Sequence, residues 1–429
     1  MFSPVSAMLT SKQFPSLFFI HMSILKELGV NKNWQDFLAK KTEKFRLSKK
    51  EEAGLRLFIQ DESYKPVTDN ILDDNFFFSV PEKKLLNKHG KGKKRVVYTF
   101  SECENNVLKL AAHLLYRYDE AQPHNCYSFR RHYGAKKAIT TITKVKDIEK
   151  KYSCKLDITD YFNSIDVNLL LPILYKLFFD DKDLYRFFEK LLTADKAFFN
   201  GAVITEKRGA MAGTPVSPFL ANVYLAEMDR FFLGKDVLYA RYSDDIIFFA
   251  DTEKSLAEYL EIVKDFLAEY HLKVNPEKVK ITKPGETWDY LGIAFNNFTI
   301  GLSDVTLKKI KGKIRRKARA IYRWKIRKKA DNRKAMVVFS RSLNRKFFGA
   351  GNEDEFTWAR WFFPLITTKS DLKKIDAYAQ EYMRYLSSGR FNKANYRTRY
   401  SDLKDCGYRS LVHEYYRYRK SGSCPGIKN

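Results

Sequence analysis

Apolar and polar positions follow four different patterns along the chain of 429 residues. Residues 1–45 are rich in apolar and aromatic side chains, which favours short helices. Residues 46–145 are basic, and the segment HGKGKKRVVYTF predicts a hairpin, because a glycine-containing turn precedes an alternating β-branched run. Residues 146–300 are the most apolar part and alternate strand-like with helix-like segments. Residues 301–429 are strongly basic and helical. The pattern therefore predicts an α+β fold with a helical C-terminal third.

One helix of the C-terminal third combines an apolar stripe with a very high positive charge. Residues 308–329 contain thirteen basic residues and no acidic one, yet Ile310, Ile314, Ala318 and Ile321 recur at helical spacing. One face of this helix is expected to pack, and the rest to point at phosphates. The alternative interpretations of this helix are a nuclear localisation signal and a helix that binds a membrane surface.

The charge of the whole chain points to the same class of partner. Lys and Arg number 78 against 51 Asp and Glu, which gives a formal net charge of +27 and a pI of about 9.6. Such an excess usually marks a polyanionic partner, most often nucleic acid, because each neutralised phosphate releases condensed counterions. An anionic membrane surface is the competing explanation.

Other features of the composition exclude several classes of protein. No run of roughly 18 apolar residues occurs, and the N-terminal segment PSLFFIHMSIL is too short for a membrane span and lacks a basic lead-in. We therefore expect a protein that neither spans a membrane nor is secreted. The five cysteines (103, 126, 154, 406 and 424) form no CxxC pair, so neither a zinc cluster nor a disulfide framework is indicated. This fits a cytoplasmic location.

Three aspartates are the strongest candidates for chemistry. In YSDDIIFFA, Asp244 and Asp245 stand directly before an apolar run, at the junction of two strand-like segments. In CKLDITDYFNSID, an apolar lead-in places Asp157 at the C-terminal end of a strand. If these strands are neighbours in one sheet, the three carboxylates converge. A solvated hairpin tip or a helix cap is the ordinary alternative for two adjacent aspartates.

A cluster of this kind, with no adjacent Lys or Arg in the sequence, is best explained by hard divalent cations with oxygen ligands, Mg²⁺ or Mn²⁺. Two such ions roughly 3.5 to 4 Å apart would clamp the attacking and leaving oxygens of a phosphoryl transfer. Between the acidic sites, Gly213, Pro215 and Pro218 are predicted to shape a loop that enters a helix, with Ser217 as its cap. Backbone N–H groups at such a helix start can hold a nucleotide.

Four motifs in this order resemble the palm of reverse transcriptases. They are DITDYF (157–162), GTPVSPFLAN (213–222), YSDD (242–245) and YLG (290–292). Upstream, KKRVVYTFSECENNVLKLAAHLL and CYSFRRHYGAKKAI look like the fingers motifs of bacterial reverse transcriptases. The resemblance covers roughly residues 85 to 300. No CxxC pair of the kind found in intron-encoded endonucleases occurs, and the Val-Thr-Gly thumb signature of retron enzymes is not found. The long C-terminal region that ends in GYRSLVHEYY looks more like that of the defence-associated, so-called unknown-group enzymes.

The resemblance implies a right-hand polymerase with an antiparallel-sheet palm. Its parts would be an N-terminal extension (1–45), fingers (46–145), a palm (146–300) and a basic helical thumb and C-terminal region (301–429). The exposed thumb cations would follow a nucleic-acid backbone, contributing affinity rather than sequence readout. The cations in this group are Lys308, Lys309, Lys313, Arg315, Arg316 and Arg319.

The resemblance also assigns roles in catalysis. Asp157 and Asp244 would ligate both metals, Asp245 would assist, and the backbone carbonyl of Ile158 would complete a coordination sphere. Lys278 would stand near the leaving pyrophosphate as a proton donor, although a solvated lysine at a strand end is an equal alternative. The cofactor implied is a pair of Mg²⁺ ions, with Mn²⁺ as a substitute.

The remaining assignments concern the nucleotide and the primer. Phe162 would stack beneath the incoming sugar and leave no space for a 2′-hydroxyl, unless it is merely a core residue. Arg95 and Arg130 would grip the triphosphate. The nucleotide loop would comprise Gly213, Pro215, Ser217 and Asn222, and the primer end would rest on Leu291 and Gly292. Many relatives carry Gln before the loop glycine, where this chain has Ala212, so template or nucleotide positioning through that side chain is expected to be absent or taken over by another residue.

The function expected is RNA-directed synthesis of cDNA from dNTPs, with an RNA/DNA hybrid as product. The expected template is a dedicated structured non-coding RNA, and the expected role is anti-phage defence. No membrane partner is expected. The alternatives are a retron-type or intron-type reverse transcriptase, an RNA-dependent RNA polymerase, and a non-catalytic RNA-binding scaffold. An RNA polymerase of this type tends to place Gly before the paired aspartates. Priming is open between an RNA hydroxyl and a protein tyrosine such as Tyr415, Tyr416 or Tyr418.

Overall fold

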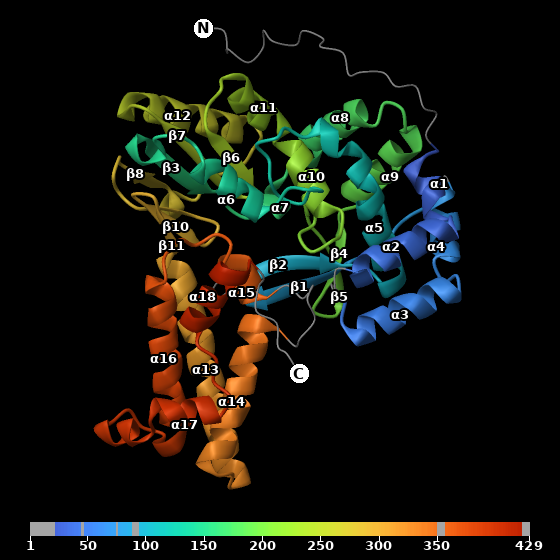
Figure 1. Cartoon of the computed structure of the whole chain (residues 1–429). Helices are drawn as coiled ribbons and strands as arrows, with labels where there is room; N and C mark the ends of the chain where they lie inside the picture. Colours follow the sequence, from blue (N-terminus) through green and yellow to red (C-terminus); the bar gives the residue numbers. More distant parts are fainter. Residues whose placement is uncertain (1–21, 44–46, 74–75, 88–93, 350–356, 423–429) are drawn as a thin grey trace.

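The computed structural model describes residues 22–43, 47–73, 76–87, 94–349 and 357–422 (Figure 1). The predicted hairpin turn at 88–93, Cys424 and residues 1–21 lie outside these ranges. Within them the chain forms three sheets and a helical C-terminal third, so the α+β prediction is confirmed. None of the described helices combines the length and the apolar composition that crossing a bilayer requires.

Between residues 22 and 121, the described stretches contain six helical segments, and side-chain caps set several of their starts. Ser48 with Glu51, and Ser101 with Glu104, each form a capping box in which both partners satisfy backbone N–H groups at the helix start. Trp34 is fully buried there, against the rings of Phe58 and Tyr64. The segments are α1 (Ile24–Leu28), α2 (Asn31–Glu43), α3 (Lys49–Gln60), α4 (Lys65–Leu72), α5 (Glu102–Leu114) and η1 (Leu115–Ala121).

The predicted hairpin is present as β1 (Glu82–Asn87) and β2 (Lys94–Thr99), which pair antiparallel. A second hairpin, β4 (Lys196–Phe199) and β5 (Ala202–Thr205), extends this sheet in the order β2-β1-β4-β5. This sheet therefore joins segments from both sides of residue 145, because β4 pairs parallel with β1.

The catalytic sheet, as we call it, has the strand order β6-β7-β3-β8 and is antiparallel throughout. Its strands are β3 (Tyr152–Asp157), β6 (Tyr239–Tyr242), β7 (Asp245–Ala250) and β8 (Lys280–Thr282). Successive side chains of a strand point to opposite faces. Accordingly, Ile246 and Phe248 join the main core, which includes α12 (Glu253–Glu269), whereas Ile247 and Phe249 pack with α6 (Ala135–Thr143) in a second core. Burial on both faces explains why β7 is apolar at every position after Asp245.

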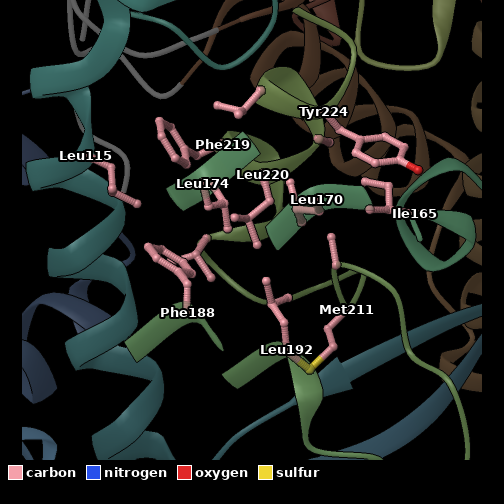
Figure 2. Close-up of a cluster of buried hydrophobic side chains, with 14 of the residues drawn as sticks. Leu115, Ile165, Leu170, Leu174, Phe188, Leu192, Met211, Phe219, Leu220 and Tyr224 are labelled. Atoms are coloured by element: carbon pink, nitrogen blue, oxygen red, sulfur yellow. The ribbon is translucent and has the colours of Figure 1, made fainter. Parts of the chain in front are cut away.

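Helices that follow β3 cover the main core. They are α7 (Tyr161–Ser164), α8 (Val167–Leu177), α9 (Lys182–Thr193), α10 (Ser217–Tyr224) and α11 (Ala226–Gly234), with short turns η2 (Ile148–Lys150) and η3 (Pro276–Lys278) elsewhere. Figure 2 shows how side chains of α8, α9 and α10 meet there: Leu170, Leu174, Phe188, Leu192, Phe219 and Leu220. This packing fixes α10, and with it the loop between β5 and α10.

The third sheet leads into the C-terminal helices. It contains β9 (Trp288–Tyr290), β10 (Ile293–Asn296) and β11 (Thr299–Leu302), in the order β11-β10-β9. The helices are α13 (Asp304–Lys328), α14 (Asn332–Phe348), α15 (Trp358–Phe362), α16 (Ser370–Ser388), η4 (Lys393–Arg397), α17 (Tyr400–Asp405) and α18 (Leu411–Ser421). In Figure 1, α13, α14 and α16 extend as a column away from the catalytic sheet.

The predicted basic helix is confirmed as α13. Ile310, Ile314, Ala318 and Ile321 are all buried in the C-terminal core, as the helical spacing indicates. One lysine of the basic series is buried as well: Lys325 donates to the carbonyls of Leu386 and Ser387 at 2.8 and 3.2 Å. A cation at the C-terminal end of α16 satisfies carbonyls that have no partner within the helix.

Candidate active site

The three predicted aspartates lie together at one end of the catalytic sheet. The antiparallel register of β3 and β7 places Asp157 directly opposite Asp245. Asp244 stands in the two-residue turn between β6 and β7, and its carbonyl accepts the N–H of Ile158 at 3.2 Å. The first turn residue, Ser243, has φ 62, a conformation in which such turns usually carry glycine. The predicted strand ends and hairpin are confirmed.

Burial makes negative charge unfavourable at two of these carboxylates. Burial, followed by the charge of neighbouring Asp157, raises the pKa of Asp244. Burial, followed by the charge of Asp244, raises the pKa of Asp245 to about 6. Lys278 lowers both pKa values, with Arg95 acting on Asp244 and Lys155 on Asp245. A bound cation would relieve the unfavourable charge further.

Lys278 lies against the carboxylates, with its Nζ 2.6 Å from Oδ2 of Asp157. The carboxylates have no adjacent Lys or Arg in the sequence, but in the folded protein a lysine lies beside them. The interpretation of a cluster without a neighbouring cation is therefore wrong. The reason is the sheet order: β8 runs antiparallel beside β3, so the residues just before β8 reach the end of β3 where Asp157 stands. Separation in sequence hides this contact.

The donor set fits a hard divalent cation only in combination with other ligands. Among the described residues, no three Asp, Glu, His or Cys side chains are gathered so that they could hold a metal ion by themselves. Mg²⁺ at sites that act on phosphates normally takes one or two carboxylates, and substrate phosphates and water supply the remaining oxygens. Asp157 and Asp244, with Asp245 beside them, supply oxygen ligands of that kind.

An aromatic row borders the carboxylates. The guanidinium carbon of Arg95, on β2, lies 5.8 Å from the centre of the Phe162 ring. Phe129 is 40% exposed and has φ 55, and its ring centroid lies 6.3 Å from that of Phe162 and 6.2 Å from that of Tyr242. Phe162 itself is partly buried at the edge of the main core. Sequence reasoning missed Phe129, although an aromatic residue directly before two arginines was a usable signal.

The structure contradicts the prediction that Arg130 grips a triphosphate. This side chain is only 8% exposed, and it donates to the carbonyls of Pro123, Cys126 and Asp119 at 2.5, 3.0 and 2.8 Å. Its guanidinium carbon also lies 4.1 Å from the centre of the Tyr133 ring. The fork of N–H groups thus ties together three carbonyls of residues 119–126, two of which also accept a backbone N–H. Arg130 shapes the segment that carries Phe129.

The loop before α10 packs against the β2 strand and the segment of Phe162. A Cβ at Gly209 would stand 2.6 Å from the carbonyl oxygen of Asn163, so only glycine fits there. Gly213 has φ 103 and lies against β2, and the preceding Ala212 accepts the N–H of Tyr98 at 2.8 Å. Ala212 is buried, which agrees with the absence of a positioning side chain at this place. Pro215 is partly buried in the same loop.

Ser217 is not the cap of this helix, contrary to prediction. It is the first residue of α10, and its hydroxyl bonds to the carbonyls of Met211 and Thr214 at 2.6 and 2.9 Å. The hydroxyl is fully buried and therefore braces the loop instead of contacting a ligand. The helix starts at Ser217, one residue before the predicted start at Pro218. Pro218 is therefore the second helical residue, and a proline is tolerated in this first turn.

Asn222 also braces the site instead of contacting a nucleotide, because it is 1% exposed. Its amide donates to Gln122 Oε1 at 2.9 Å and to the Ser128 carbonyl at 2.7 Å, and its oxygen accepts from Ser128 Oγ at 2.9 Å. Ser128 Oγ in turn accepts the N–H of Ser243 at 2.9 Å. This chain of bonds ties the strained turn before Asp244 to the segment that contains Arg130.

We expect Ser128→Ala to lower kcat by about tenfold while the KM for the nucleotide stays unchanged, because a buried N–H left without an acceptor costs about 1 to 3 kcal/mol. Single-nucleotide incorporation with saturation of each substrate measures both constants. The matched control is Ser340→Ala, which removes an equally buried hydroxyl from α14. Equal kcat values for the two variants would show that the bond to Ser243 has no role in positioning.

Leu291 and Gly292 form the two-residue turn between β9 and β10, with φ 48 and 89. The preceding Tyr290 donates through its hydroxyl to the carbonyls of Asp245 and Ala240, each at 3.2 Å. This contact holds the predicted primer turn beside the strand that carries Asp245. All six predicted backbone-binding cations of α13 are exposed.

The three aspartates stand at one end of an antiparallel sheet. An aromatic ring and an arginine of a neighbouring hairpin border them. This arrangement is the palm of a right-hand nucleic-acid polymerase. Residues 83–295 match the family described as "Reverse transcriptase (RNA-dependent DNA polymerase)". This part of the chain is a reverse transcriptase domain.

The curated relatives are bacterial retron enzymes. The chain is 28% identical over 117 residues to the Retron Mx65 reverse transcriptase of Myxococcus xanthus, which covers 26% of this chain and 27% of the relative. It is 22% identical over 171 residues to the Retron Ec86 reverse transcriptase of Escherichia coli, covering 39% and 49%. The chain thus spans half the length of these relatives or less. Among solved structures, apo telomerase from Candida tropicalis is similar with a TM-score of 0.43 and 13% identity, over 73% of this chain and 64% of that one.

Proposed function

We propose that this protein is an RNA-directed DNA polymerase that makes cDNA from dNTPs. The observation that carries the proposal is the register of β3 and β7, which pairs Asp157 with Asp245 beside Asp244 inside a reverse transcriptase domain. Within this proposal, residues 1–45 are an N-terminal extension, 46–145 the fingers, 146–300 the palm and 301–429 the thumb and C-terminal region.

Two Mg²⁺ ions, replaceable by Mn²⁺, would be held by Asp157, Asp244 and the carbonyl of Ile158, with Asp245 beside them. When bound, such ions stabilise the charge that develops on the attacking and leaving oxygens. Lys278, whose Nζ lies 2.6 Å from Oδ2 of Asp157, would act as a proton donor to the leaving pyrophosphate. Arg95 binds the triphosphate, and the Phe162 ring lies under the sugar.

The exposed face of α13 binds the backbone of the template and product duplex. We expect the triple variant Lys309→Gln, Lys313→Gln, Arg316→Gln, whose positions recur at helical spacing, to bind an RNA/DNA hybrid more weakly for every sequence. The slope of log affinity against log salt should fall by up to about 2.7, because each lost phosphate contact removes roughly 0.9. Fluorescence anisotropy over a salt series measures this slope.

The matched control removes the same charge from the N-terminal helices, with Lys32, Lys49 and Lys50, all exposed, changed to Gln. This control should leave the slope within about 0.5 of the parent value. An equal loss of slope in both triple variants would mean that α13 acts only through the net charge of the protein.

Primer extension tests the activity directly. The purified protein is expected to extend a DNA primer on an RNA template with dNTPs and Mg²⁺ or Mn²⁺, and to use rNTPs much more slowly. Preference for rNTPs would identify an RNA polymerase instead. Absence of any metal-dependent synthesis on primed RNA and DNA templates would favour a non-catalytic RNA-binding protein.

We also propose a narrower role: cytoplasmic copying of a dedicated structured non-coding RNA in anti-phage defence. The support is the likeness of the motifs and of the long C-terminal region to defence-associated enzymes. Sequencing the RNA and DNA that copurify with the protein tests it, since the DNA should be the complement of one RNA, and its 5′ end should reveal an RNA hydroxyl or a tyrosine as primer. DNA copied from many unrelated RNAs would contradict a dedicated template.

A further inference from the structure

Beside the three aspartates, one carboxylate of the third sheet holds two lysines of the catalytic sheet. Lys155 of β3 and Lys280 of β8 stand directly opposite each other in the register of these strands. Asp289 of β9 bonds to both: its Oδ2 lies 2.8 Å from Nζ of Lys155, and its Oδ1 lies 3.0 Å from Nζ of Lys280. Like charges that face each other across two strands destabilise a sheet, so Asp289 compensates for this pair. We call these three residues the charge bridge.

The charge bridge lies on the same face of the catalytic sheet as two of the aspartates. Lys155 stands two residues before Asp157 on β3, and side chains two residues apart on a strand point to the same face. Asp245 pairs with Asp157, so it lies diagonally across from Lys155, at a backbone distance of about 7 to 8 Å. Ile247, which pairs with Lys155, shares its core with Trp288 of β9. The long side chain of a lysine can cover the distance to Asp245.

The electrostatics of both carboxyl groups agree with a lysine close to each of them. Burial raises the pKa of Asp245, and Lys155 is the cation that lowers it most. Burial also raises the pKa of Asp289, but the bonds with the two lysines outweigh this effect and lower it, so this carboxyl group is ionised. Lys155 therefore has two carboxylates within reach, and in this structure it bonds to Asp289.

The strand that carries Asp289 is fixed against the catalytic sheet. The residues on either side of it, Trp288 and Tyr290, are both buried. The hydroxyl of Tyr290 also donates to carbonyls of β6 and β7, each at 3.2 Å. The carboxylate of Asp289 is therefore a fixed anchor, whereas the four-carbon stem of Lys155 is flexible.

We propose that Asp289 is a positioning residue that holds the amine of Lys155 away from Asp245, so that this lysine does not compete with a divalent cation for the carboxylate. The inference rests on the proposed polymerase function and assigns a role to a residue outside the metal site. Without the charge of Asp289, Lys155 would turn to Asp245. An amine bonded there occupies an oxygen that the cation needs, and its positive charge repels the cation.

The test measures Mn²⁺ binding by electron paramagnetic resonance, with the protein bound to dNTP and a dideoxy-terminated primer on RNA. Asp289→Asn keeps the shape of the side chain but removes the charge that holds the lysine, and the apparent Kd for Mn²⁺ should rise about tenfold. In the double variant Asp289→Asn, Lys155→Met the Kd should return to within about twofold of the parent value, because the competing amine is gone. Lys155→Met alone should bind Mn²⁺ at least as tightly as the parent.

Two further variants separate this role from a merely structural one. Glu27→Gln breaks a partly buried ion pair with Arg117 in the N-terminal helices and should bind Mn²⁺ like the parent. Asp289→Glu keeps the charge and should bind Mn²⁺ more tightly than Asp289→Asn does. A parent-like Kd in Asp289→Asn would overturn the proposal. A raised Kd that Lys155→Met does not restore would overturn it as well, because Asp289 would then act through the structure of β9 and not through the lysine.

Nucleotide incorporation, measured beside Mn²⁺ binding, separates this inference from the proposed function. If the parent protein binds Mn²⁺ but extends no primer on any template, the polymerase proposal fails, while the Kd values still decide the role of Asp289. If the parent extends primers and Asp289→Asn needs no more Mg²⁺ than the parent does, only the positioning role fails. The expected result for Asp289→Asn is a rise of about tenfold in the Mg²⁺ concentration for half-maximal incorporation, with kcat at saturating Mg²⁺ unchanged.

Discussion

Replacing both Asp244 and Asp245 with asparagine should reduce nucleotide incorporation by about 10³-fold or more, while the protein stays folded. Asparagine keeps the shape of the side chain but removes the charge that a divalent cation requires, and the ions are worth several kcal/mol of transition-state stabilisation. Single-nucleotide incorporation under saturating conditions measures the loss. Asp251→Asn, at an exposed aspartate directly after the other end of β7, is the matched control and should keep parent activity.

The same double variant should be more stable than the parent in the absence of metal. A carboxyl group whose pKa is raised on folding favours the protonated form in the folded state. For Asp245, the stability gained from this protonated form is fully present below the unfolded pKa of 3.8. It is lost as the pH rises through the folded pKa of about 6. The difference in Tm between variant and parent, measured with EDTA, should therefore be larger at about pH 8 than at about pH 5. Undiminished incorporation by the double variant would mean that these aspartates do not carry the chemistry.

Phe162→Ala should lower the preference for dNTP over rNTP by about 10- to 100-fold, measured as the ratio of kcat/KM values. A bulky ring under the sugar excludes a 2′-hydroxyl by steric overlap, which costs about 1 to 3 kcal/mol, and alanine removes the overlap. Phe162→Tyr keeps the ring and should keep the preference.

Phe179→Ala is the control for loss of an aromatic ring in general, because Phe179 is 71% exposed on the loop between α8 and α9. It should leave the preference unchanged. If Phe162→Ala lowers stability but leaves the ratio of kcat/KM values at the parent level, Phe162 acts only as a residue of the core edge.

Local patterns in the sequence were enough to locate the catalytic strands. An apolar run that ends in Asp157, and two strand-like segments that meet at Asp244, predict strand ends wherever the strands lie in the sheet. The apolar stripe of α13 is equally local. Successive residues of a strand point to opposite faces, so the sequence also predicts that Ile246 and Ile247 join different cores. It does not predict which helices pack on each face.

Contacts between distant segments were beyond the reach of these patterns. The ion pair of Lys278 with Asp157 depends on the order of strands in the sheet. Arg130 and Asn222 looked like ligand contacts because polar residues in motif positions often bind ligands, yet both are occupied by buried hydrogen bonds within the protein. Phe129 has a local signal, since it directly precedes two arginines, but only its ring contacts with Phe162 and Tyr242 place it at the site.

The central claim is that Asp157, Asp244 and Asp245 form one divalent-metal site, although Asp157 lies far from the other two in the sequence. The most direct test is electron paramagnetic resonance with Mn²⁺, titrated into the protein bound to dNTP and a dideoxy-terminated primer on RNA. We predict two bound Mn²⁺ ions for the parent protein, and loss of tight binding in Asp157→Asn and in the double Asp244→Asn, Asp245→Asn variant. The same number of ions bound with the same affinity in these variants would contradict the claim.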